Sequence, residues 1–276
     1  MDDHSEEKGS FMKLTRALAV ASVVAVLALT GCSKSNTAAT ITFGVDATYA
    51  PNEFKDSNGN PIGWDVELGS AIAKQLGKTA VFKIATFDTI IPGVTGGKYD
   101  AGLSSFTDTA EREKQVDFVN YYSAGIQWAT TAGKTVDPNN ACGLKVAVQT
   151  GTYEVDDLNV LSKACVAAGK AAITQLSFDD QSMATQAAVS GRADAMTADS
   201  PITEYAVKQS GGKLDLIGSP YQSAPYGIAV KKGNTELANS IKSALTALQA
   251  DGTYTKILDK WGVTAGAVSA ITINGK

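Results

Sequence analysis

Two oppositely charged residues, Arg112 and Asp199, stand where strands are expected to give way to helices. Arg112 is expected in the first turn of a helix, with Thr109 as its N-cap. Free backbone N–H groups at a helix start favour an anion, and a guanidinium can bind a carboxylate bidentately. A cation there costs roughly 0.3–1 kcal/mol against the helix dipole, so a bound anion should compensate it. The alternative is a solvated arginine, or one paired with Glu111 or Asp108.

Asp199 ends an expected strand whose surroundings repeat those of Arg112. Arg112 follows a helix, the turn Gly97–Ala101 and a strand. Asp199 likewise follows a helix, the turn Gly191–Ala195 and a strand. Ligands of open α/β sheets bind at the carboxyl ends of strands, so the two charges can converge on one cleft. An anion site beside a cation site suits the carboxylate and ammonium of a free amino acid. Alternatively, Asp199 only precedes Ser200-Pro201 at a helix start.

Short β-branched runs alternate with helical stretches along the chain, which predicts an α/β fold. The expected strands cover residues 41–45, 80–84, 99–104 and 145–148. The expected helices cover residues 65–76, the stretch from Thr86 or Asp88 to Val94, and residues 236–250, the last with apolar residues at helical spacing. These elements must position the two charged residues.

The N-terminal part reads as an export signal. An apolar stretch from Leu14 to Thr30 follows Lys13 and ends in Leu29-Thr30-Gly31-Cys32, which resembles the bacterial lipobox. That resemblance implies cleavage before Cys32 and lipidation of its thiol, followed by a short polar tether. An uncleaved membrane anchor is the competing interpretation. Because residues 1–11 are acidic and precede Met12, translation can start at either Met1 or Met12.

Composition excludes several function classes. The only histidine, His4, lies in the leader, so no imidazole is left for a nucleophile pair or a metal, and we expect no metal or cofactor. The formal net charge is −4 and no basic run occurs, so nucleic acid is not an expected partner. Cys142 and Cys165 form an even pair in an exported protein, where a disulfide worth about 3 kcal/mol is the default. Two buried free thiols are the alternative.

Five blocks in this order resemble the polar amino-acid-binding proteins of ABC importers, solute-binding protein family 3: Val45–Pro51, Gly63–Leu68, Leu103–Arg112, Gly191–Ala195 and Asp251–Tyr254. The resemblance implies an α/β, two-lobed periplasmic-binding-protein fold of type II, with hinge crossings near Ala124-Gly125 and Ala224-Pro225. Residues 1–31 would be the signal and its extension, and residues 32–40 the lipidated cysteine and tether. Lobe 1 would hold residues 40–124 and 225–276, and lobe 2 residues 125–224.

The resemblance also implies the ligand contacts. Arg112, Thr107 and the segment Gly151-Thr152-Tyr153 would hold the ligand carboxylate, and Asp199 with Ser105 beside it would hold the ammonium. The remaining expected contacts are Tyr49 and Phe87, which would sandwich the ligand side chain, Asp46 and Gln149 at its far end, and Ser104. Taken singly, a tyrosine or phenylalanine is more often part of a core.

Asp46 favours arginine, lysine, ornithine, histidine or glutamine over glutamate or aspartate, because relatives that take basic or amide side chains keep an acid there. Two departures from the family pattern occur. Asn52 replaces a usually apolar residue, and Asn120-Tyr121-Tyr122 replaces Asp-Pro-Tyr. The first departure can change the pocket wall, so the identity of the amino acid stays open.

The resemblance therefore predicts a monomeric, lipid-anchored receptor that faces the periplasm or the cell exterior. It would close on a free polar amino acid and deliver it to the permease of an ABC importer in the membrane. The first alternative is an exported enzyme like the cyclohexadienyl dehydratases, with Glu53 as its candidate acid. The second is a sensory amino-acid-binding lipoprotein.

Overall fold

The computed structural model describes residues 39–275. The leader, the expected lipidation site Cys32 and most of the tether lie outside the described residues. Within them the fold is α/β, with one large mixed sheet of strand order β5-β1-β6-β11-β7-β10-β8-β9 and β12 paired with β7. A second, three-stranded sheet has the order β2-β3-β4. No helix in the described part of the chain is long and apolar enough to cross a bilayer.

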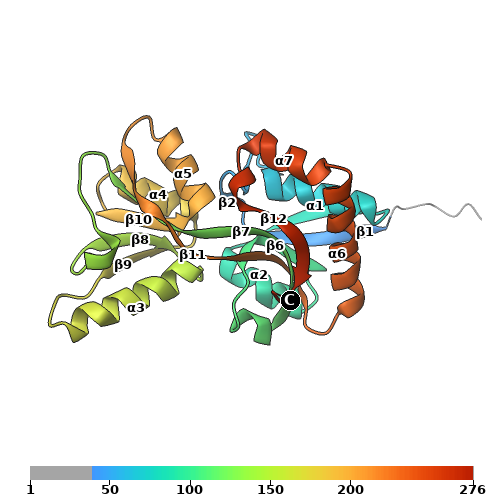
Figure 1. Ribbon diagram of the computed structural model, residues 1–276, viewed down its shortest axis with the longest axis horizontal. Coiled ribbons are helices and arrows are strands. Elements are labelled where there is room, and N and C mark those ends of the chain that lie inside the picture. Colours follow the sequence, from blue (N-terminus) through green and yellow to red (C-terminus); the bar gives the residue numbers. More distant parts are fainter. Residues whose placement is uncertain (1–38, 276) are drawn as a thin grey trace, which may run out of the picture. The chain divides into compact units, whose positions relative to one another are not determined.

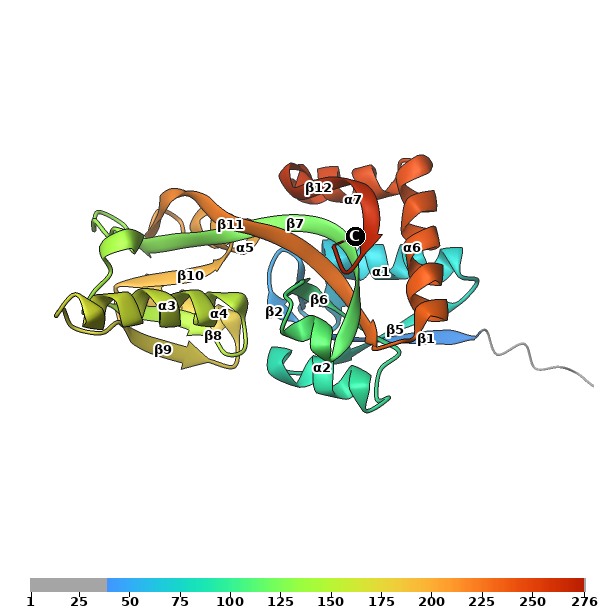
Figure 2. The same ribbon diagram turned by 60° about the horizontal axis from the view of Figure 1, so that its bottom comes forward.

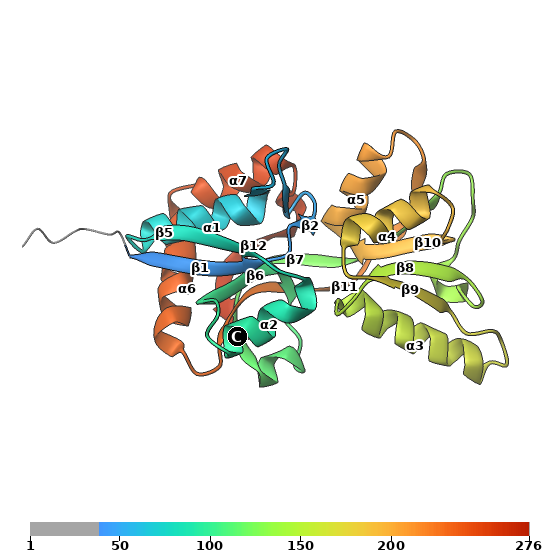
Figure 3. The same cartoon turned by 180° about the vertical axis from the view of Figure 1, so that it is seen from behind.

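One half of the large sheet, here called lobe 1, has a parallel core in which β1 lies between β5 and β6. Its helices α1, α6 and α7 surround one face and α2 covers the other (Figures 1 and 3). The elements of lobe 1 are β1 (Thr40–Val45), α1 (Trp64–Gln75), β5 (Thr79–Ile84), α2 (Phe87–Thr95), β6 (Ala101–Thr107), η1 (Arg112–Lys114), α6 (Thr235–Ala250), α7 (Thr253–Trp261), η3 (Thr264–Gly266) and β12 (Ala267–Ile273).

The other half, lobe 2, is built from parallel strands in which β8 lies between β9 and β10. Helices α4 and α5 pack on one face, and α3 packs on the other with the cluster of Leu158 and Val148. The elements are η2 (Pro138–Asn140), β8 (Lys145–Gln149), α3 (Tyr153–Ala167), β9 (Thr174–Phe178), α4 (Gln181–Val189), β10 (Ala195–Asp199) and α5 (Ser200–Gln209).

Two long strands run through both lobes (Figure 2). They are β7 (Val116–Thr131) and β11 (Leu214–Lys231), which pair antiparallel with each other over most of their length. Ala124 of β7 pairs with Ala224 of β11, and the register shifts on both sides of that pair. The two strands are therefore the only covalent links between the lobes among the described residues, whereas the expected lobe boundaries at these positions stay a prediction.

The helices bury the faces that their apolar spacing indicates. In α6 the buried residues are Ala238, Ile241, Ala244, Leu245 and Leu248, so the predicted core role of this helix is confirmed. The Asn234 side chain accepts a hydrogen bond from the backbone N–H of Leu237 and caps the same helix. The buried residues of α6 belong to the same hydrophobic cluster as Phe43 and Trp64, so this helix is part of the core of lobe 1.

The three-stranded sheet holds the start of α1. It consists of β2 (Thr48–Tyr49), β3 (Glu53–Lys55) and β4 (Pro61–Ile62). The carbonyl of Asn52 accepts from the backbone N–H of Asp65, and that of Pro51 accepts from Trp64. Gly63, the residue before α1, has φ 126°, and a Cβ atom on it would overlap the Asn52 carbonyl. This tight turn places Tyr49 and Asp65 on neighbouring segments.

The predicted helix at Arg112 is wrong. The chain forms only the three-residue 3-10 turn η1, because Val116 already starts β7 and pairs with Lys231. Thr109 keeps part of its predicted role, since its hydroxyl accepts a hydrogen bond from the Arg112 backbone N–H at 3.2 Å. A turn this short has little macrodipole, so the dipole argument for an anion does not apply here.

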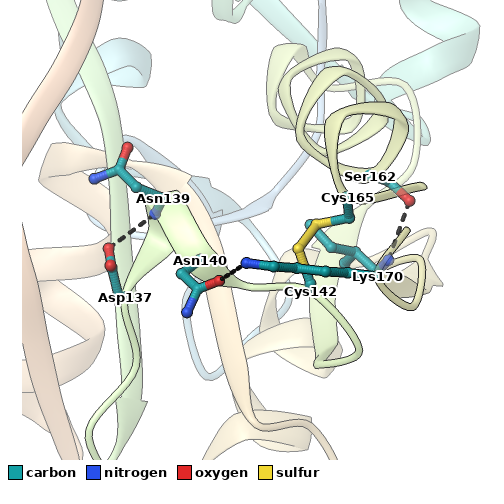
Figure 4. Close-up of a disulfide and its surroundings, with 8 residues drawn as sticks. Asp137, Asn139, Asn140, Cys142, Ser162, Cys165 and Lys170 are labelled. Carbon is teal, nitrogen blue, oxygen red and sulfur yellow. Dashed lines mark hydrogen bonds between the residues drawn. A yellow bond between two sulfur atoms is a disulfide. The ribbon is translucent and has the colours of Figure 1, made fainter. Parts of the chain in front are cut away.

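Cys142 and Cys165 are bonded to each other in the structure, with a sequence separation of 23 (Figure 4). The bond ties the segment before β8 to the last turns of α3. Around it, Lys170 donates to the Asn140 side chain at 2.9 Å and the Ser162 hydroxyl accepts from the Ile173 backbone N–H at 3.1 Å. The alternative of two free thiols is not what the structure contains.

We expect thiol labelling to find neither Cys142 nor Cys165 reactive in unfolded, unreduced protein carrying Cys32→Ser. Reduction should lower the free energy of unfolding by about 3 kcal/mol, because the bond restricts the unfolded chain. Mass spectrometry after labelling counts the thiols, and denaturant titration with and without reductant measures the stability. Two reactive thiols in the unreduced protein would contradict the pairing.

Candidate functional site

A small cavity lies where strands of both lobes end. Its walls combine the end of β6, the turn η1, the end of β10 and the start of α3, and its accessible volume is about 10 Å³, room for about one water molecule. The lining residues are Tyr49, Phe87, Ser105, Thr107, Arg112, Thr152, Tyr153, Glu154 and Asp199. A larger hollow of about 410 Å³ lies among the crossing strands, α5 and α7, but its charged wall residues, Glu204 and Lys208, form no comparable buried group. The small cavity is the stronger candidate, because opposite charges converge on it.

Arg112 reaches from lobe 1 to lobe 2. Its guanidinium donates to the Thr107 carbonyl at 2.7 Å and to the Gly151 carbonyl at 3.0 Å. The central carbon lies 5.4 Å from the ring centre of Phe87 and 5.6 Å from that of Phe106. Burial lowers the pKa of Arg112, although a guanidinium stays charged in proteins. It keeps N–H donors beyond these two bonds, so it can still bind a carboxylate.

The competing interpretations of Arg112 are wrong. Glu111 pairs with Lys114 on the surface. The Asp108 carboxylate accepts from the Asn120 side chain at 2.8 Å, and burial raises the pKa of Asp108 to about 6. The guanidinium donates to the two backbone carbonyls instead and is aimed at the cavity.

Asp199 ends β10 and is the N-cap residue of α5. Its side chain does not cap that helix but accepts a hydrogen bond from the Tyr49 hydroxyl at 2.7 Å, while its backbone N–H donates to the same hydroxyl at 3.2 Å. Burial raises the pKa of Asp199 to about 6. The side chain therefore faces the cavity as a buried acid and does not merely decorate a helix start.

The serines at the end of β6 bond to a buried acidic pair. Ser104 donates to Glu53 at 3.0 Å, and the Ser105 backbone N–H donates to Asp65 at 3.1 Å. The Ser105 hydroxyl lies 3.2 Å from a carboxylate oxygen of each acid and accepts from Asn52 at 2.8 Å. Burial raises the pKa of Glu53 well above its usual range and that of Asp65 to about 6. Ser105 lines the cavity, but its hydroxyl has no bond with Asp199, and Ser104 does not line it.

Asp46 and Gln149 meet outside the cavity wall. The Gln149 amide donates to the Asp46 carboxylate and also to the Asp179 carbonyl at 3.1 Å. Both side chains are buried, and burial raises the pKa of Asp46 to about 6. Asp46 comes from lobe 1 and Gln149 from lobe 2, so this bond joins the lobes, as do the bonds from Arg112 to Gly151 and from Tyr49 to Asp199.

The aromatic residues form two different walls. Phe87 stacks on Phe106 with ring centres 4.5 Å apart, below the Arg112 guanidinium. Tyr49 belongs to the other wall, because its hydroxyl is held by Asp199. Both residues line the cavity, so both are available to contact a bound molecule.

Sequence reasoning missed Glu154. It is the second residue of α3, where an acid is ordinarily a solvated complement of the helix dipole. Here the side chain is only 2% exposed and lines the cavity. Burial, and next the charge of Asp199, raise the pKa of Glu154 to about 8. The one available signal was its place two residues after Thr152, in a segment already expected to contact the ligand.

The sequence matches the family model for bacterial extracellular solute-binding proteins, family 3, over residues 41–264. It is 38% identical over 237 residues to the arginine-binding protein ArgT of Corynebacterium glutamicum, covering 85% of this chain and 78% of that protein.

Solved structures agree with this match. An ancestral arginine-binding protein is 38% identical and aligns with a TM-score of 0.75 both when bound to arginine and when bound to glutamine. The alignments cover 80% and 81% of this chain and 97% and 98% of those chains. An ancestral amino acid-binding protein described as a precursor of cyclohexadienyl dehydratase is 36% identical, with a TM-score of 0.73 and coverage of 80% and 95%.

Proposed function

The chain belongs to the bacterial extracellular solute-binding proteins of family 3, and from this membership we propose that it is the substrate-binding protein of an ABC amino-acid importer. The observation that carries the proposal is the convergence of Arg112 and Asp199 on one cavity between strand ends. A free amino acid presents a carboxylate and an ammonium a few atoms apart. The guanidinium takes the carboxylate bidentately, and the Asp199 carboxylate takes the ammonium.

Both lobes contribute to this clamp. Arg112 comes from lobe 1, whereas Asp199, Thr152 and Tyr153 come from lobe 2. A ligand that bonds to both sides is bound best when the lobes approach each other, so it favours the closed arrangement. The ribbon of β7 and β11 is the place where this hinge motion occurs.

For the ligand we propose a basic or amide amino acid, arginine before glutamine. Two of the proteins named above are arginine-binding proteins, and one of these is solved with glutamine as well. The Asp46 carboxylate offers an acceptor to a cationic or amide side chain. The Gln149 amide N–H groups are both engaged, by Asp46 and by the Asp179 carbonyl, so Gln149 offers its oxygen, which has no partner among the described residues, as a second acceptor. Tyr49 and Phe87 supply aromatic surface for the aliphatic part of the side chain.

We also propose export and lipid anchoring through Cys32, with delivery of the amino acid to a membrane permease by a monomeric receptor. The support is the sequence Leu29-Thr30-Gly31-Cys32 after an apolar stretch, together with the extracellular character of the family. Metabolic labelling with a radioactive fatty acid tests the anchor. Label should enter the protein and be lost with Cys32→Ala, and light scattering of the purified protein tests the monomer.

A thermal-shift screen against the common amino acids and ornithine tests the binding function. A ligand at a hundred times its Kd stabilises the folded state by about 2.7 kcal/mol. For a chain of this size that is a rise of roughly 5–10 °C in Tm. We expect arginine to give the largest rise. If no amino acid raises Tm, the chain is not a receptor for amino acids.

Catalysis is not part of the proposal. The candidate acid Glu53 is fully buried behind Ser104 and Ser105 and does not line the cavity. A dehydratase acting on a prephenate-like acid would also gain little from the ammonium site at Asp199. Incubation with prephenate or arogenate, followed by absorbance and chromatography, should reveal no product. Turnover above the rate without protein would favour the enzyme.

Asp46→Asn should weaken the binding of arginine by about 10–100-fold and that of glutamine much less. A hydrogen bond to a charged group in a closed cleft is worth about 1.5–3 kcal/mol, and only the cationic ligand uses the charge. Calorimetry with both amino acids at pH 8, where Asp46 is ionised, measures the difference. Asp259→Asn on the exposed face of α7 is the control for a lost surface charge. Equal losses for both amino acids would give Asp46 a structural role only.

A further inference from the structure

Glu154 is a buried acid that the proposed clamp does not use. Its side chain lines the same cavity as Arg112 and Asp199, and one of its carboxyl oxygens, Oε1, has no hydrogen-bond partner among the described residues. Buried polar atoms in native proteins are nearly always bonded, and an unpaired one is costly. A carboxyl oxygen without a partner on the wall of a binding cavity indicates that a donor belonging to a bound molecule completes its hydrogen bonding.

The charges around Glu154 say which kind of donor fits. Asp199 faces it from β10, Arg112 from η1, Tyr49 from β2 and Tyr221 from β11, and Asp156 shares its helix turn. The tyrosines are neutral, so one cation, Arg112, stands against two acids within the cavity wall. Arg112 already donates to two carbonyls and is reserved for the ligand carboxylate. A cationic donor is therefore the group that this end of the cavity lacks.

We propose that Glu154 is a second carboxylate of the ammonium site and that it releases its proton to solvent when the ammonium of an amino acid binds. The inference rests on the proposed function and deepens it. In the step, the carboxylic O–H bond breaks and its proton passes to the buffer. The carboxylate left behind accepts a hydrogen bond from the ammonium, and nothing is oxidised or reduced.

The environment of Glu154 keeps its carboxyl group protonated before an amino acid binds. Burial and, next, the charge of Asp199 together raise its pKa to about 8, whereas the Arg112 charge and the nearby Thr152 side chain oppose the shift. At pH 7.5 the acid therefore mostly carries a proton. An ammonium beside it stabilises the charged form and lowers that pKa, so binding expels the proton.

The sign of the pH effect follows from linkage. Because binding releases a proton, raising the pH favours the complex, and one full proton corresponds to a tenfold gain in affinity for each pH unit. The gain should stop above about pH 8, where Glu154 is already ionised. Asp46 and Asp199 titrate near pH 6, so their protons contribute little at pH 7.5.

Calorimetry of arginine binding at pH 7.5 in phosphate and in Tris tests the inference, because the two buffers have different heats of protonation. We expect a release of more than half a proton per arginine for the unmutated protein and almost none for Glu154→Gln. At pH 8.5 the variant should bind arginine about tenfold more weakly, since a neutral amide replaces a charge-assisted acceptor.

Asp156→Asn is the matched control, because it removes an exposed acid from the same turn of α3. It should keep both the proton release and the affinity. Arginine binding without proton release in the unmutated protein would overturn the inference while leaving the receptor function standing, and so would equal release by Glu154→Gln. Absence of binding by any amino acid would instead overturn the proposed function. The measurement on the unmutated protein decides the matter even if the variant does not fold.

Discussion

Alanine at Arg112 or at Asp199 should abolish measurable binding of every amino acid, whatever its side chain. In the closed cleft each charge is removed from water and paired, so removing one partner strands the opposite charge of the ligand. Such truncations cost about 2–5 kcal/mol, which is roughly 30-fold to several thousand-fold in affinity. Calorimetry with arginine and glutamine measures both variants.

Stability should change far less than binding. Burial raises the pKa of Asp199 above that of the unfolded chain, so its contribution to stability is complete below about pH 4 and is lost as the pH rises through about 6. At pH 7 its removal therefore costs little beyond the bond to Tyr49, and Tm should stay within about 4 °C. Arg112→Ala loses two hydrogen bonds and should lower Tm by a few degrees.

Lys114→Ala is the control for the loss of a cation, because Lys114 lies in the same turn and pairs with Glu111 on the surface. It should bind like the unmutated protein. Binding within tenfold by Arg112→Ala or Asp199→Ala would reject the amino-acid clamp. So would equal binding of ligands that lack the α-ammonium.

Gly63→Ala should lower the free energy of unfolding by about 3 kcal/mol or more. Its backbone has φ 126°, a region that only glycine adopts readily, and a Cβ would overlap the Asn52 carbonyl. That carbonyl accepts from Asp65, so relief of the overlap must displace the start of α1. Urea titration followed by circular dichroism measures the loss.

Gly59→Ala separates the two causes. Gly59 also has a positive φ, 83°, but a Cβ there meets nothing within 4 Å. It should cost only the conformational strain, about 1 kcal/mol. If Gly63→Ala costs no more than Gly59→Ala, the contact with Asn52 yields easily and the turn does not hold α1 in place.

Local patterns predicted the elements and the paired charges. The apolar spacing of α6 and the alternation of strands and helices depend on residues close in the sequence, and the structure contains both. The prediction of a helix at Arg112 was wrong because Val116 already pairs with Lys231 in the sheet, which leaves no room for a helix. That partner lies more than a hundred residues away in the sequence, so local patterns do not show it.

The site could be predicted only as far as residue types allowed. Eight of the eleven expected ligand residues line the cavity. The other three do not: Asp46 and Gln149 bond to each other, and Ser104 bonds to Glu53. The bonds of Ser105 to Glu53 and Asp65 depend on two segments meeting in space, as does the burial of Glu154. Burial and pairing are properties of the tertiary structure, so a single sequence carries no direct signal of them.

The long strands β7 and β11 also set the order in which the chain can be completed. β7 ends at Thr131 and β11 begins at Leu214, so nearly all of lobe 2 is synthesised between these two partners. Lobe 2 can fold from a contiguous segment, but the sheet of lobe 1 must close a much longer loop, which is slower. A chain that emerges N-terminus first therefore leaves β6 and β7 with unpaired edges until β11 arrives. During that interval those edges need protection from pairing with other chains.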